Sequence, residues 1–387
     1  MFLKTVGDLV GVSGTAITRY ETGEDKPQRD RLEAIAAQLG FSVDFFTRPG
    51  WHEEFEPIFW RSRAAESKQA REMTEQRMKW ACEIFSFFER EVNFPPLNLP
   101  DVPLPEDFHL ITGDMIESAA DAVRKHWSLY DRPIPDVALA LENAGVPVLS
   151  LDILSEKQDG FCFRSATLAR PFVGVSTNNI SRCRARYDLG HELGHLILHR
   201  HVTPQQERIP TFKKLIEQQA HRFAGAFLFP KSCFLREVGY PSLDFFCDLK
   251  RRWGMSIGAM IYRAFNLGRI GEAEKTALYQ GMSKRKWRGP LQEPFDEPEL
   301  MPVERPRMLR RAMETVLRES IFGIAAVQSE LPFPPNEIEL IVGLEKGALT
   351  PAPVVEFATP ARKRGLQIAD LETGTILEFP GAQRKPV

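Results

Sequence analysis

The sequence feature that most constrains this chain is the pentapeptide His191-Glu192-Leu193-Gly194-His195. Residues four apart share one face of an α-helix, so His191 and His195 can bind the same metal ion. Glu192 is adjacent, where a carboxylate can act as general base toward a water that the ion activates. The spacing of the neighbouring leucines and of Ile197 favours a buried helix. The pattern therefore predicts a helical metal site, and the alternative is a core helix that carries two histidines.

Two histidines do not complete such a site, because catalytic zinc is held by three protein ligands and a water. A second apolar-periodic helix is predicted over residues 215–230, ending at a proline. Glu217 in this helix is the predicted third ligand, although a solvated carboxylate would also fit its position. His221, one turn further, is an alternative ligand or a partner of the ligands. His199 continues the face of the first helix and is expected to support the ligands or to be structural.

Residues 184–195, 217–224 and 228–230 together resemble the ImmA/IrrE family of zinc metallopeptidases. The resemblance covers roughly residues 110–290. It implies a fold similar to that of the gluzincin peptidases, with His191, His195 and Glu217 as zinc ligands. In this family a peptidase domain often follows a DNA-binding domain of the Xre/Cro type on the same chain.

The resemblance also implies roles for other residues. Glu192 would be the general base, and the substrate would be a specific protein such as a transcriptional repressor or an antitoxin-like partner. The chain departs from the family at Gly190, where alanine is frequent, and at His221, where asparagine is frequent. Tyr262 or Arg263, in a run that resembles the closing helix of the family's domain, could stabilise the oxyanion. Core packing with an exposed Arg263 is the alternative for that helix.

Residues 5–23 have the layout of a helix-turn-helix, with a glycine-containing turn. Ser13 can cap the second helix, and Thr15, Thr18 and Arg19 would point outward near its start, where such helices contact DNA. The segment resembles an Xre/Cro-type domain through Val12, Ser13, Ile17, Thr18, Glu21, Gly23 and Pro27.

The charge of this segment does not favour strong DNA binding. Residues 1–50 contain six Lys/Arg and seven Asp/Glu, a net charge of −1 instead of a basic footprint. Domains of this type usually begin with another helix, which is expected to be missing here. DNA binding, dimerisation and docking therefore remain open functions for residues 1–50.

The composition narrows the class of protein. A length of 387 residues predicts two or three domains. The five scattered cysteines suit a reducing cytoplasm and argue against a disulfide framework. No apolar run of 18 residues or signal peptide is recognised, so no membrane association is expected. The net charge of −2 makes no case for nucleic acid outside a local region.

The predicted fold is α+β and mostly helical. Its predicted parts are a helix-turn-helix (1–50), a helical connector and Pro-rich linker (51–110), a metallopeptidase domain (111–290) and a helical C-terminal region with a tail (300–387). Within the peptidase domain we expect two helices, at 116–127 and 134–144, and strands at 146–151, 160–164 and 171–176. The edge of one of these strands would bind an extended peptide over the metal. One helix is expected from 305 to about 328, another short one within 331–345, and a hairpin at 370–379.

These observations predict a cytoplasmic zinc-dependent endopeptidase linked to a helix-turn-helix module, acting in transcriptional or stress regulation. The first alternative is a one-component, DNA-binding transcription regulator whose metal domain senses a ligand or a partner, with little or no proteolysis. A homodimer is an assembly compatible with either reading. The second alternative is a zinc-stabilised interaction scaffold. Histidine and carboxylate ligands also suit divalent ions other than zinc.

Overall fold

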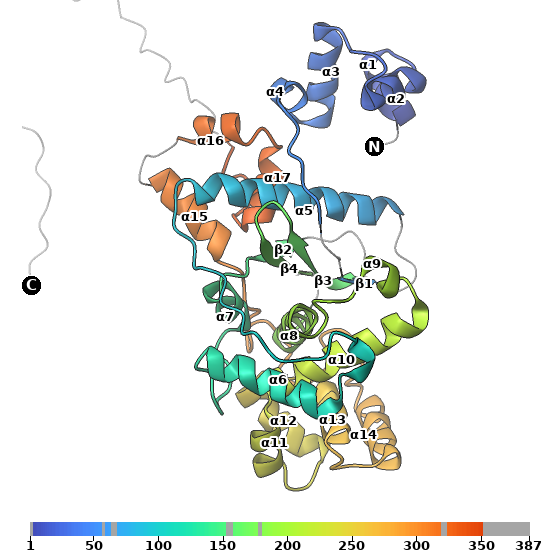
Figure 1. Cartoon of the computed structure of the whole chain (residues 1–387), viewed down its shortest axis with the longest axis vertical. Helices are drawn as coiled ribbons and strands as arrows, with labels where there is room; N and C mark the ends of the chain where they lie inside the picture. The colour runs from blue at the N-terminus through green and yellow to red at the C-terminus, as the bar shows by residue number, and fades with distance from the viewer. Residues whose placement is uncertain are drawn as a thin grey trace, which may run out of the picture. The chain divides into compact units, whose positions relative to one another are not determined.

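The computed structural model describes residues 3–55, 59–62, 68–151, 158–176, 180–318 and 323–350. Within these residues the fold is α+β and mostly helical, as predicted, with a small sheet (Figure 1). In the described part of the chain, no helix is both long and apolar enough to span a membrane. The hairpin predicted at 370–379 lies outside the described residues.

The N-terminal helices form a helix-turn-helix. Ser13 caps α2, and its hydroxyl accepts a hydrogen bond of 3.1 Å from the Ala16 amide. Gly7 lets the first helix approach the turn, because a β-carbon there would lie 2.6 Å from the Val12 carbonyl oxygen. A small apolar core holds the helices together. The helices are α1 (Leu3–Val10), α2 (Gly14–Thr22), α3 (Arg29–Leu39) and α4 (Val43–Thr47).

The sheet has four strands in the order β1-β3-β4-β2, where β2 pairs with β4 in parallel and the other pairs are antiparallel. The three predicted strands correspond to β2 (Val148–Leu151), β3 (Gln158–Ser165) and β4 (Arg170–Ser176). The fourth, β1 (Phe59–Ser62), comes from the region predicted as a helical connector. Four residues are too few to show strand alternation in a sequence.

The two faces of the sheet pack against different helices. Cys162 and Val173 face the core that contains α8 (Arg182–Leu198). The opposite face carries aromatic residues, and the Phe172 ring lies 5.5 Å from that of Phe85 in α5 (Lys68–Glu89). Gly174 leaves room for an aromatic ring on this face, since a β-carbon there would lie 2.1 Å from Cζ of Phe161.

Small residues allow α10 (Pro210–Leu228) to pack closely along α8. A β-carbon at Gly194 would lie 3.2 Å from Cα of Ala220, tighter than most contacts of real side chains. At Gly190 the nearest atom, Cα of Ala224, would be 3.5 Å away, so the alanine frequent in the resembled family would also fit. The close approach brings the second predicted ligand helix to the first. Around this pair lie η1 (Phe108–Leu110), α6 (Gly113–His126), α7 (Val137–Asn143), α9 (Pro204–Glu207), α11 (Lys231–Glu237), α12 (Leu243–Trp253), α13 (Ile257–Asn266) and α14 (Glu272–Lys284).

The C-terminal helices are α15 (Met308–Arg318), α16 (Ile324–Glu330) and α17 (Pro335–Val342). The helix predicted from 305 to 328 is thus found as two helices, separated by the stretch 319–322, which lies outside the described residues. Their apolar faces share one core with α5 and the aromatic face of the sheet. Arg77 of α5 forms an ion pair of 2.9 Å with Glu337 of α17.

Candidate metal centre

Buried polar contacts fix the position of α8. Arg186 is 1% exposed and donates hydrogen bonds of 2.8 Å to the Ile134 carbonyl and 3.1 Å to the Gly254 carbonyl. It also pairs with Glu304, from the loop before α15. A buried guanidinium needs such partners, because an unpaired buried charge is strongly unfavourable. The helix is therefore tied to three separate segments of the chain.

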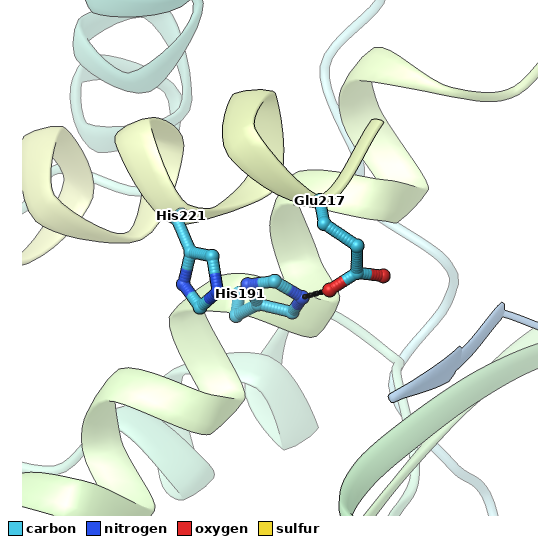
Figure 2. Close-up of side chains that lie close together, drawn as sticks. All are labelled: His191, Glu217 and His221. Atoms are coloured by element: carbon cyan, nitrogen blue, oxygen red, sulfur yellow. Dashed lines mark ion pairs between the residues drawn. The ribbon is translucent and has the colours of Figure 1, made fainter. Parts of the chain in front are cut away.

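The structure brings His191, His195 and Glu217 together. Nε2 of His195 lies 3.0 Å from Nε2 of His191. Oε2 of Glu217 lies 3.3 Å from His191 Nε2 (Figure 2). The other carboxylate oxygen, Oε1, lies 3.6 Å from His195 Nε2. With ligand distances of about 2.0–2.1 Å, two ligands of a tetrahedral zinc ion are separated by about 3.3 Å. The separations between the two imidazole nitrogens and the nearest Glu217 oxygens, 3.0–3.6 Å, are close to this value.

His221 is a further neighbour of this group. Its ring centroid lies 4.4 Å from that of His191, and ligand atoms of His191, Glu217 and His221 lie within 4.8 Å of one another (Figure 2). The hydroxyl of Tyr187 donates a 3.0 Å hydrogen bond to the His221 carbonyl, which ties this turn of α10 to α8. The structure thus places His221 next to His191 and Glu217, one turn beyond Glu217 on α10.

A chain of hydrogen bonds assigns the tautomer of His195. The Gln219 amide nitrogen donates to the carbonyls of Phe108 (2.8 Å) and Ile111 (3.2 Å), so its oxygen faces His199 Nε2, 3.0 Å away. Burial, with the neighbouring His195, lowers the pKa of His199 to about 3, so His199 is neutral at pH 7. Its proton is then on Nε2, and Nδ1 accepts from His195 Nδ1, 2.9 Å away. This leaves the His195 lone pair on Nε2, the atom that faces the other two ligands.

Glu217 is ionised in this setting. Burial alone would raise the pKa of its carboxyl, but the hydrogen bonds with His191 and His195 hold that pKa well below its usual range. The side chain is 23% exposed, whereas the two histidines are almost fully buried. The site therefore has one anionic ligand at its more open side and two imidazoles within the core, a donor set suited to zinc.

Glu192 is fully buried against strand β3. A β-carbon at Gly160 would lie 2.9 Å from Oε1 of Glu192, so the glycine provides the space for this carboxylate. The Cys162 thiol, two residues along the strand, hydrogen-bonds the Glu192 side chain, and burial together with this negative neighbour raises the pKa of the thiol. Sequence reasoning missed Gly160, Cys162 and Gln219. Gly160 and Cys162 are two residues apart on a predicted strand and therefore share one face. This spacing was the sequence signal that could have identified these two residues.

The helix that carries Tyr262 packs against α10. Tyr262 is half-buried beside Tyr279 of α14, whose pKa is raised to about 12 by burial. Its role as oxyanion residue stays a prediction. Arg263, the other residue considered there, is 1% exposed and forms a two-pronged ion pair with Glu117, with both distances 2.7 Å. Its guanidinium is thus a structural link between α13 and α6 instead of an exposed side chain.

The four residues proposed to contact DNA lie exposed at and after the start of α2. Thr18 donates a 3.1 Å hydrogen bond to the Gly14 carbonyl, and Arg19 lies 3.6 Å from Asp25. Ser13 is engaged in capping the helix, which leaves Thr15 and Arg19 with the most freedom to contact a ligand. Their role in DNA binding stays a prediction.

Two segments of the chain match models of known protein families. Residues 141–265, which contain α8, α10 and the sheet strands β2, β3 and β4, match the model of the IrrE N-terminal-like domain, a family of metallopeptidases. Residues 3–46, which contain α1 to α3 and most of α4, match the helix-turn-helix model. No curated protein matches the chain. The protein thus combines an Xre-type helix-turn-helix with an IrrE-like peptidase domain, as the sequence predicted.

Proposed function

We propose that this protein is a zinc-dependent endopeptidase that hydrolyses a specific protein substrate. The observation that carries the proposal is the close approach of the ligand groups of His191, His195 and Glu217, whose nearest atoms lie 3.0–3.6 Å apart. The buried carboxylate of Glu192 supports it, because it belongs to the residue next to the first ligand and borders a sheet strand.

A zinc ion bound by these three residues would supply Lewis-acid chemistry, activating a water and polarising the scissile carbonyl. Glu192 takes the proton from the attacking water and passes it to the leaving amine. His199 and Gln219 hold His195 in the tautomer whose Nε2 lone pair is available. Tyr262 is proposed to hydrogen-bond the tetrahedral oxyanion.

The substrate class rests on the resemblance to the ImmA/IrrE family. We propose a transcriptional repressor or an antitoxin-like protein, cleaved in the cytoplasm, with the helix-turn-helix placing the peptidase in a regulatory circuit. A homodimer is the proposed assembly if residues 1–50 bind a two-fold DNA site.

The proposal is tested by substituting Glu192→Gln, which keeps the size of the side chain and removes the base. Metal content is measured by elemental analysis, and each form is co-expressed with candidate repressors while a discrete fragment is sought. We expect metal in wild type and variant, and a fragment only with wild type, with a rate loss of at least about 10²-fold.

Two further variants complete this test. Glu217→Gln should lose metal and activity together, because it removes the anionic ligand. Glu272→Gln, on the exposed side of α14, should keep both. Absence of metal from wild type after zinc supplementation would overturn the site.

A second function is supported by the helix-turn-helix match at residues 3–46. In this function the chain is a one-component transcription regulator whose metal domain is a sensor. It predicts regulated DNA binding that is unchanged by Glu192→Gln, whereas the peptidase predicts that the regulatory output depends on Glu192.

A further inference from the structure

A cavity separate from the metal centre lies between α15 and the residues at the starts of α7 and α8. Its volume is about 640 Å³, within the range of about 300–1,000 Å³ that is usual for small-molecule sites. The walls are α15, the loop 302–307, the residues just before α7, and Arg182 at the start of α8. The lining includes none of the three proposed metal ligands, so the cavity is a second candidate site.

The loop that forms one wall of the cavity is held in place by Glu304. Its side chain is 4% exposed, and its carboxylate accepts bonds from the Val137 amide (2.7 Å) and from Arg182 Nη2 (3.2 Å). Pro302 and Pro306 further restrict the backbone of this loop. A ligand that binds between fixed walls costs less conformational entropy than one that must order a loop.

The lining of the cavity has more positive than negative charge. Five arginines and three acidic residues contribute to it, which leaves a formal excess of two positive charges. Each acidic residue already has an arginine partner. The pairs are Arg182–Glu304 (3.2 Å), Arg307–Asp136 (2.9 Å) and Arg310–Glu314 (2.8 Å).

The two remaining arginines, Arg305 and Arg311, are exposed, and neither forms an ion pair with another residue that the structure describes. Arg310 lies beside Arg311 on α15, and its pair with Glu314 is an exposed pair of the kind that contributes little to stability. Guanidinium groups donate paired hydrogen bonds to phosphate and carboxylate oxygens. A phosphate monoester carries nearly two negative charges at neutral pH, so it matches the excess better than a carboxylate does.

The cavity also has room and apolar surface for more than a phosphate ion. At about 30 Å³ for each heavy atom, the share of a water molecule, the five heavy atoms of phosphate fill roughly a quarter of it. Pro135, Pro302, Val303 and Pro306 provide apolar atoms in the same lining. A ligand that uses both features has a phosphate group and an apolar organic part.

We propose that this cavity binds a small organic molecule with a phosphate group, and that Arg305, Arg310 and Arg311 hold the phosphate. The organic part lies against the loop 302–307. Arg182, which also lines the cavity, is nine residues before His191, about 13 Å along α8. A bound ligand therefore contacts the helix that carries the metal ligands without reaching the metal position. The inference does not rest on the proposed peptidase activity.

The first test is isothermal titration calorimetry of the full-length protein with phenyl phosphate, at about pH 7.5, where its second ionisation is nearly complete. Benzoate keeps the ring and carries one charge, and inorganic phosphate lacks the ring. We expect phenyl phosphate to bind at least tenfold more tightly than either. Equal binding of benzoate would overturn the preference for phosphate, and equal binding of inorganic phosphate would overturn the organic part. Absence of phenyl phosphate binding would overturn the site.

A pair of variants assigns the binding to the cavity. Arg305→Gln/Arg311→Gln removes the two charges that have no ion-pair partner and should weaken phenyl phosphate binding at least tenfold. Arg29→Gln/Arg208→Gln is the matched control, because it makes the same change of charge at two exposed arginines outside the cavity. It should bind as wild type does. Equal affinities for the two variants would overturn the assignment, and circular dichroism checks that both are folded.

Hydrogen exchange measured by mass spectrometry locates the ligand in the wild-type protein and needs no variant. Phenyl phosphate should slow exchange in residues 302–311 and in the first turn of α8, and leave α3 unchanged. The same affinity is expected with and without added zinc. Binding that requires zinc, or protection confined to residues 191–221, would place the phosphate at the metal centre and overturn the inference. Failure of the peptidase would change none of these results.

Discussion

Gln219 determines the protonation of two buried histidines without contacting the proposed metal position itself. Its amide nitrogen is fixed by two backbone carbonyls, and its oxygen therefore accepts from His199. A rigid acceptor at the end of such a chain orients the ligand His195 and keeps its Nε2 lone pair free. The residue thus links η1 and the loop after it to the metal-binding face of α8.

Gln219→Leu should lower zinc affinity by about 10- to 100-fold, because His199 loses its acceptor and no longer fixes the His195 tautomer. Zinc affinity is measured by competition with a chromophoric chelator. Gln218→Leu is the matched control, since it makes the same change on the exposed side of α10. Equal affinities for the two variants would contradict the role assigned to Gln219.

At the level of elements, two glycines allow the sheet to pack closely against its helices and its own aromatic residues. Gly160 makes room for Glu192 on the face toward α8, and Gly174 makes room for Phe161 on the face toward α5. Neither position has the positive φ that by itself requires glycine. Space therefore accounts for these two glycines, and backbone conformation does not.

Gly174→Ala should lower the free energy of unfolding by about 2 kcal/mol or more, because the added methyl overlaps the buried Phe161 ring. Gly239→Ala is the control, as no atom lies within 4 Å of a β-carbon there. In thermal unfolding, Phe161→Leu should reduce the effect of Gly174→Ala, a coupling expected for residues in contact. The same loss in both backgrounds would argue against the overlap as its cause.

Glu142 joins α7 to the start of α15. Its buried carboxylate accepts bonds from the amides of Arg307 (2.9 Å) and Met308 (2.8 Å). Burial raises the pKa of this carboxyl to about 7, although the two amide bonds act in the opposite direction. Since the folded-state pKa is above the unfolded one, the stability contribution is fully present below pH about 4.5 and is lost as pH rises through about 7.

Glu142→Gln removes this titration. The stability of wild type relative to the variant should therefore fall between pH 5 and 8, by a free energy on the order of 3 kcal/mol. Melting temperatures at intervals across this range test the expectation. Parallel curves for the two proteins would show that the carboxyl does not titrate there.

On the scale of the whole molecule, aromatic contacts connect the helix-turn-helix to the rest of the described chain. The Phe45 ring of α4 lies 6.5 Å from Trp80 of α5 and 6.1 Å from Phe333, which precedes α17. Arg48, just after α4, pairs with Glu83 of α5. These contacts hold α4 next to α5 and to the residues that precede α17.

DNA binding is the prediction that belongs to this scale. Because residues 1–50 carry a net charge of −1, full-length protein should bind a selected duplex with fewer phosphate contacts than a basic domain. Its affinity should fall by less than the ~10³-fold that six phosphate contacts cause between 50 and 200 mM salt. Arg19→Ala should weaken binding and Lys284→Ala should not, as measured by fluorescence anisotropy. Failure to select any duplex would leave docking as the role of this domain.

Local signals in the sequence were sufficient to predict much of the fold and of the candidate site. Helical periodicity and capping residues predicted α2, α8 and α10, and the resemblance was enough to name both domains. His191 and His195 were proposed as ligands from their four-residue spacing on one helix, which is a local property. Glu217 was proposed from a second predicted helix and from the family resemblance.

Only the tertiary structure decided which residues, distant in the sequence, surround the three proposed ligands. The Gln219 side chain, which faces His199, is held by the carbonyls of Phe108 and Ile111, more than a hundred residues earlier in the sequence. Gly160 lies next to Glu192 across the interface between the sheet and α8. The four residues of β1 pair with a strand about a hundred residues later, and no periodicity in so short a segment reveals that partner. Such contacts depend on how helices and strands pack together. The space available to a side chain is set by residues from other elements, and these residues are not part of its local sequence.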